Sequence, residues 1–101
     1  MRIIEKLSDM ISEELDDAEK YAKCAIEHKD SDKQLAALFY ELSNEEMNHM
    51  NRLHDAVTRI IAEYRAKSGE PPADMMAVYE YLHGKQISHA TQVKMMQSLF
   101  K

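Results

Sequence analysis

Tryptophan is absent from this 101-residue chain, which also has only two Gly, two Pro and one Cys. The scarcity of Gly and Pro, together with abundant Ala, Leu, Met, Glu and Lys, favours helices over strands. The single Cys24 cannot form an internal disulfide and is typical of a reducing compartment. We therefore expect one all-α domain over residues 1–101, located in the cytoplasm.

Long uncharged runs and a basic excess are also missing. Charged residues interrupt the N-terminal segment MRIIEKLSDM every few positions, so it resembles neither a signal peptide nor a transit peptide. No uncharged run approaches the roughly eighteen residues that a membrane span needs. The net charge is -5, and the 13 Lys and Arg are scattered rather than gathered in a stripe. We expect no membrane and no nucleic-acid partner, whereas metal ions fit the charge.

Two breaks divide the chain into helical stretches. The first stretch runs from about Ile3 or Ser8, a possible N-cap, to His28. The turn HKDSD follows, and a second helix runs from about Asp32 to Lys67. Gly69 can cap its end. Residues 1–68 are thus predicted to form a long antiparallel hairpin.

A C-terminal helical segment is predicted over residues 72–101. Pro72 is well placed near a helix start, and Asp74 suits a first turn. Gly84 could kink or divide this segment. The pattern therefore predicts three helices, or four if Gly84 breaks the last one.

Polar residues interrupt the apolar seams of the two hairpin helices. Steps of three and four residues along the first helix give Ile4, Leu7, Ile11, Glu14, Ala18, Tyr21, Ala25 and His28. The same steps along the second helix give Leu35, Phe39, Leu42, Glu46, His49, Leu53, Ala56 and Ile60, flanked by Met50, Val57, Ile61 and Tyr64. An unpartnered carboxylate in an apolar interface costs several kcal/mol. Glu14, Glu46 and His49 therefore need a compensating partner.

The helical rise predicts that these three residues meet. Glu14 lies about 24 Å before the turn, and Glu46 and His49 lie about 24 to 28 Å after it, at 1.5 Å per residue. The i, i+3 spacing places Glu46 and His49 on one helix face, opposite Glu14. Carboxylates and imidazole are suitable ligands for iron or manganese. We predict a metal site here, with Tyr21 either hydrogen-bonding a ligand carboxylate or serving as a core tyrosine.

The order of these residues resembles the first helical hairpin of the ferritin-like superfamily. The matching segments are EELDDAEKY at residues 13–21 and NEEMNH at residues 44–49. The likeness covers roughly residues 8–65 and is strongest to rubrerythrins and to the short encapsulated ferritins. The resemblance implies that Glu14 and Glu46 are carboxylate ligands, with Glu46 bridging, that His49 is a terminal ligand, and that Tyr21 supports them.

A dinuclear site needs two lone Glu and two E-x-x-H pairs, and one hairpin supplies half of this set. We therefore expect a homodimer or higher homo-oligomer in which two hairpins complete a four-helix bundle around two Fe ions, or alternatively two Mn ions. The resemblance implies oxidation of Fe(II) by O2 or peroxide. The C-terminal VKMMQSLFK does not resemble the extended targeting tail of encapsulated ferritins.

A second E-x-x-H match, Glu80 and His83, lacks a further long helix with another lone Glu. Helical rise places it some 15 Å from Glu46, so we expect it outside the site. His89 falls nearer to Glu46, but we expect it to be structural. His28 and His54 are expected to be surface or packing residues.

A non-enzymatic helical interaction or scaffold protein is the alternative function. Its long second helix and its eight Met residues would form a partner surface, with Met75, Met76, Met95 and Met96 at an interface. Glu14, Glu46 and His49 would then form a buried network without metal.

Overall fold

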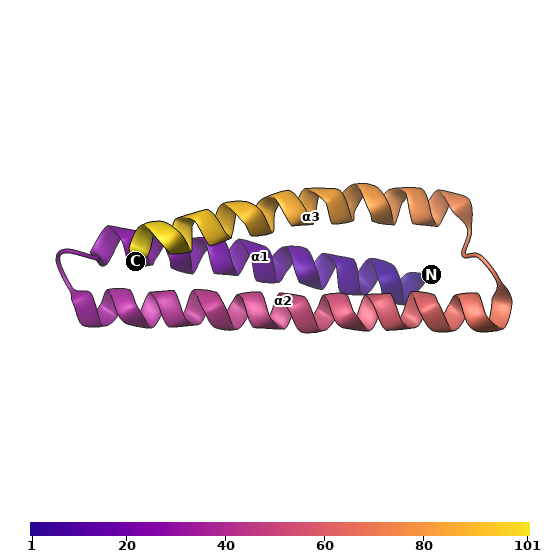
Figure 1. Cartoon of the computed structure of the whole chain (residues 1–101), viewed down its shortest axis with the longest axis horizontal. Coiled ribbons are helices and arrows are strands. Elements are labelled where there is room, and N and C mark those ends of the chain that lie inside the picture. Colours follow the sequence, from indigo (N-terminus) through magenta and orange to yellow (C-terminus); the bar gives the residue numbers. More distant parts are fainter.

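The chain folds into three long helices, and the computed structural model describes all 101 residues. Helix α1 spans Arg2–His28, α2 spans Lys33–Ser68 and α3 spans Ala73–Phe100. About 90% of the chain is helical and it has no strands, which confirms the all-α prediction. The bundle measures 55 × 18 × 18 Å. Helix α1 lies between the other two helices and packs against both (Figure 1), whereas α2 and α3 meet through side-chain pairs such as Ser43–Gln97 and His54–His83.

Local sequence explains where most of the helices begin and end. The Asp32 side chain caps α2 by accepting a hydrogen bond of 3.1 Å from the Leu35 backbone N–H. Gly69 follows α2 with φ at 81°, a conformation that favours glycine. Ser8 is not an N-cap, because α1 begins at Arg2 and Ser8 lies buried within it. Gly84 does not divide α3, which continues as one helix to Phe100.

On α1 the predicted apolar seam is confirmed, because Ile4, Ile11, Ala18 and Ala25 are buried, whereas on α2 the most buried side chains lie beside the predicted seam. The core cluster comprises Ile4, Ile11, Leu15, Ala18, Met47, Val57, Ile61 and Val93. Leu15 and Met47, each adjacent in sequence to a predicted metal ligand, are buried, whereas Leu42 and Leu53 are half-buried. The difference arises because α3 covers one side of the hairpin and moves the centre of the core toward itself. The predicted seam of α2 therefore lies along a side of the hairpin that remains partly open.

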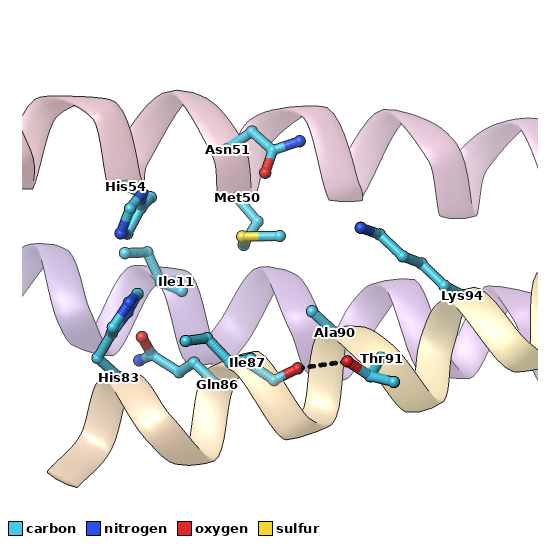
Figure 2. A pocket seen from close by; sticks show the side chains of 10 residues that line it. All are labelled: Ile11, Met50, Asn51, His54, His83, Gln86, Ile87, Ala90, Thr91 and Lys94. Carbon is cyan, nitrogen blue, oxygen red and sulfur yellow. Dashed lines mark hydrogen bonds between the residues drawn. The ribbon is translucent and has the colours of Figure 1, made fainter. Parts of the chain in front are cut away.

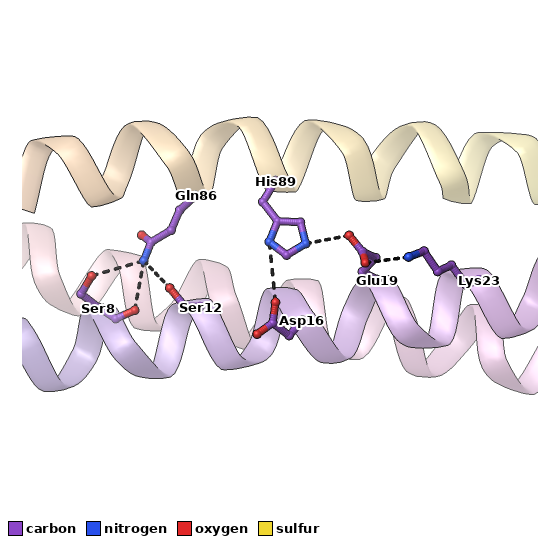
Figure 3. A network of polar contacts seen from close by, with 7 residues as sticks. All are labelled: Ser8, Ser12, Asp16, Glu19, Lys23, Gln86 and His89. Atoms are coloured by element: carbon purple, nitrogen blue, oxygen red, sulfur yellow. Dashed lines mark hydrogen bonds and ion pairs between the residues drawn. The ribbon is translucent and has the colours of Figure 1, made fainter.

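Polar side chains join α3 to α1 (Figure 3). The Gln86 Nε2 group donates hydrogen bonds of 3.0 Å to the Ser8 carbonyl and 3.0 Å to the Ser12 hydroxyl. The Nε2 atom of His89 lies 3.0 Å from Glu19 Oε1. These contacts set the register between α1 and α3.

None of the helices has the combination of length and apolar composition required to span a membrane.

Candidate metal centre

Glu14 of α1 meets Glu46 and His49 of α2 at the middle of the hairpin. One ligand atom from each of the three residues lies within 4.8 Å of the others. The Nδ1 atom of His49 lies 3.4 Å from Glu14 Oε2 and 3.9 Å from Glu46 Oε2. Because α1 and α2 are antiparallel and joined by a short turn, equal distances from that turn place these residues at one level. The predicted meeting of the three side chains is therefore present.

The two carboxylates are mostly shielded from solvent, whereas the imidazole is accessible. The side chains of Glu14 and Glu46 are 25% and 19% exposed, and that of His49 is 51% exposed. A proton shared with Glu14 raises the pKa of Glu46 to about 7, and burial and the Glu14 charge add to the shift. Two carboxylates this close cannot both ionise easily without a cation between or beside them.

One oxygen of this cluster has no hydrogen-bond partner. Glu14 Oε2 is buried and accepts no hydrogen bond. Such an oxygen is costly unless a proton or cation satisfies it. A cluster of two carboxylates and one imidazole provides the ligand types that iron and manganese accept. The residues present therefore fit a hard or borderline divalent cation.

The other predicted residues lie outside this cluster. The Tyr21 ring stacks on Phe39, with ring centroids 6.3 Å apart. The supporting role of Tyr21 stays a prediction. The His28 ring also packs against Phe39, at a centroid distance of 5.8 Å. His89 lies 3.0 Å from Glu19 across the α1–α3 interface, and its structural role stays a prediction.

Sequence reasoning missed a second polar site, which Figure 2 shows between α2 and α3. The rings of His54 and His83 stack with centroids 4.8 Å apart, and Tyr79 stacks on His83. Burial, followed by the charge of His54, lowers the pKa of His83. Together with Gln86, the two histidines help to line a cavity of about 330 Å³. Glu80 and His83 are thus not part of the Glu14 cluster.

A sequence signal exists for Gln86, one of the residues that line this cavity. Steps of seven residues along α3 pass through Tyr79, Gln86, Val93 and Phe100. Gln86 interrupts this apolar row much as Glu14 interrupts the row on α1. A polar residue in such a row indicates a buried hydrogen-bonding partner, which is Ser8 here.

Comparisons with protein-family models, with curated proteins and with solved structures give no match to this chain.

Proposed function

We propose that this chain is a ferritin-like metal-binding protein whose site holds iron, or alternatively manganese, and supports oxidation of Fe(II) by O2 or peroxide. The observation that carries the proposal is the cluster of Glu14, Glu46 and His49, which contains a buried carboxylate oxygen without a hydrogen-bond partner. The raised pKa of Glu46 supports it, because a bound cation would relieve the repulsion between the two carboxylates.

A site shared between two chains fits the geometry of this cluster. One chain contributes two carboxylates and one imidazole. The apolar side chains beside them on α2, including Leu42 and Leu53, are only half-buried. A second hairpin packed on this side would bury that apolar surface and double the ligand set to four carboxylates and two imidazoles. The ferritin-like four-helix bundle would then form from two chains.

Within such a site the residues of this chain have separate tasks. Glu14 and Glu46 would neutralise the cations, with Glu46 able to bridge them, and His49 would supply a nitrogen ligand from the accessible side. The bound metal would supply the one-electron chemistry toward O2 or peroxide. At neutral pH, the Glu46 carboxyl would release its proton on metal binding.

Metal analysis of the purified protein after Fe(II) addition tests this proposal. We expect about one iron per chain in a dimeric species and accelerated Fe(II) oxidation under O2. Glu46→Ala and His49→Ala should lose most of the bound iron while retaining helical circular dichroism.

Glu45→Gln is a matched control, because Glu45 is adjacent to Glu46 but exposed and outside the cluster. It should bind iron as the wild type does. Equal loss of iron in Glu45→Gln and Glu46→Ala would indicate nonspecific binding to acidic surface. A wild type that stays metal-free, with unchanged stability after Fe(II) addition, would overturn the proposal.

A metal-free scaffold is the second candidate function. The 3.4 Å approach of His49 to Glu14 favours it, because an imidazolium could neutralise the carboxylates instead of a metal. Retained assembly and stability in the presence of a strong chelator, together with no iron uptake, would support this alternative.

A further inference from the structure

The outward face of α3 is the least charged exposed surface of the molecule. Tyr81 and Met95 are 63% and 64% exposed on this face. Val78, Ile87 and Leu99 flank them and are each more than half exposed. The exposed faces of α1 and α2 instead carry frequent Lys, Arg, Asp and Glu. A helix with apolar residues all around it is usually buried on every side.

The exposed residues of α3 follow a heptad pattern. Steps of four and three residues from Ala77 pass through Tyr81, Gly84, Ser88, Thr91, Met95 and Ser98, and every one of these residues is exposed and uncharged. This spacing keeps them in one row along the helix, as in a coiled-coil seam. Alternate positions of the row form two sets. The large set contains Tyr81, Ser88 and Met95, and the small set contains Ala77, Gly84, Thr91 and Ser98.

Gly84 gives an independent reason to expect a close neighbour. It lies inside α3, where glycine is less favourable than alanine by about 1 kcal/mol. A Cβ atom at this position would meet nothing within 4 Å in the same chain. The chain itself therefore gives no steric reason for glycine, whereas a second helix packed against α3 would.

From these observations we infer that α3 pairs with α3 of a second copy, antiparallel, about a two-fold axis that passes between Gly84 and Ser88. In an antiparallel pair, the large set of one helix faces the small set of the other. Tyr81 then faces Thr91 of the partner subunit, and Met95 faces Ala77 of the partner subunit. A parallel pair would instead place each large side chain against its own copy.

The charges beside the row fit the same antiparallel register. Glu80, Ile87 and Lys94 are seven residues apart along one edge of the row. The two-fold axis brings Glu80 opposite Lys94 of the partner subunit, twice, and Ile87 opposite its own copy. On the other edge, the Lys85 ammonium lies 5.1 Å from the centroid of its own Tyr81 ring. The surface is thus self-complementary in size, and in charge along the Glu80–Lys94 edge, whereas on the other edge Lys85 faces its own copy.

This interface is separate from the candidate metal centre. Ser12 and Glu19 on α1 contact α3, and the helical repeat places Glu14 on the opposite side of α1. The pairing through α3 therefore requires no metal. A chain with two different two-fold interfaces would form assemblies larger than a dimer.

Sedimentation of the full chain in a chelating buffer tests the inference. We expect the wild type to associate at micromolar concentration, and Met95→Lys to weaken that association about tenfold or more, because the new charge would lie in an uncharged row. Ala66→Lys adds the same charge at an exposed position on α2 and should associate as the wild type does. Equal association of wild type and Met95→Lys, or a monomeric wild type, would overturn the inference.

Gly84→Ala gives a result that simple loss of folding cannot produce. Alanine favours the helix, so the dissociated chain should melt at a higher temperature, while association should weaken. If this variant gained stability with unchanged association, the close approach at Gly84 would be disproved.

Disulfide formation in a Cys24→Ser background tests the orientation. Antiparallel pairing brings two copies of Ile87→Cys together near the axis, whereas two copies of Ala77→Cys are about 27 Å apart by helical rise. Efficient linkage through Ala77→Cys would show parallel pairing and overturn the register.

Association that is lost in His49→Ala but kept in Met95→Lys would instead assign the interface to the hairpin. A monomeric chain that binds phosphatidylcholine vesicles through α3 would indicate a membrane surface and overturn self-pairing.

Discussion

The two interfaces of α1 bring together different combinations of polar side chains. Toward α3, the Gln86 amide donates hydrogen bonds to acceptors on α1, and His89 meets the oppositely charged Glu19 when protonated. Toward α2, Glu14 and Glu46 bring like charges together, whereas the unpartnered buried oxygen of Glu14 has a counterpart on the α3 side in Gln86 Oε1. A donor paired with an acceptor, or a pair of opposite charges, is a matched contact and holds helices together. Two like charges at a helix interface are mismatched and require a further ligand. The α1–α3 contacts therefore fit a structural role, whereas the Glu14–Glu46 cluster between α1 and α2 is a candidate ligand site.

Metal addition should produce the largest change and should act only on the mismatched interface. At a free Mn²⁺ concentration one hundred times its dissociation constant, binding to the folded state alone should stabilise the chain by about 2.7 kcal/mol. Thermal denaturation with and without Mn²⁺ measures this effect. Glu46→Ala should show no such shift. An equal shift in Glu46→Ala would assign the ion to another place.

Breaking the matched interface should destabilise the chain without affecting metal binding. Gln86→Leu removes the donor to Ser8 and Ser12, and should lower the free energy of unfolding by about 1 to 3 kcal/mol. Urea denaturation measures the loss, and Mn²⁺ titration should give an unchanged affinity. Gln34→Leu, at an exposed position on α2, should have little effect. Stability equal to that of the wild type would contradict a structural role for Gln86.

The metal-free cluster should make stability depend on pH. The folded chain raises the pKa of Glu46 from 4.5 to about 7, so between these values it binds more protons than the unfolded chain. The free energy of unfolding should therefore fall as pH rises through this interval and change little above it. Denaturation in a chelating buffer from pH 4.5 to 8 measures the slope.

Glu46→Gln is the control for this pH dependence. It cannot ionise, so most of the slope should disappear and the metal-free chain should be more stable than the wild type at pH 8. A slope that persists in Glu46→Gln would arise from other groups.

The partly exposed ion pair of the α1–α3 interface should give the smallest effect. His89→Gln removes the contact with Glu19, whose side chain is 27% exposed. We expect a loss of about 0.5 kcal/mol, because solvent screens such pairs. Urea denaturation measures it. A loss of several kcal/mol would instead show that His89 belongs to a tightly coupled network.

Helices and candidate ligands were predictable because both follow from local pattern. The Asp32 cap, the Gly69 turn and the position of Pro72 define helix ends through their own chemistry. Equal distances from the turn at residues 28–32 predicted that Glu14 would meet Glu46 and His49, which the structure contains. Local pattern did not define the start of α1, since Ser8 suits both an N-cap and a buried polar position within a helix.

The position of the core was not predictable in the same way. The row of α2 chosen from its apolar spacing includes Leu42 and Leu53, which are half-buried, whereas Met47 and Val57 are buried beside it. Apolar periodicity identifies which side of a helix is apolar within about one residue step, and it does not say where a third helix will lie. The stacking of His54 on His83 likewise joins two distant helices.

The sequence by itself determined that this protein is helical, where its helices end, and which carboxylates and imidazole share a level in the hairpin. These properties depend on residue propensity, capping and the constant rise of a helix. Only the tertiary structure decided that α3 lies along α1, that one side of the hairpin stays partly open, and that an uncharged face of α3 points outward. Those outcomes depend on side-chain packing between distant segments, which short-range pattern does not specify.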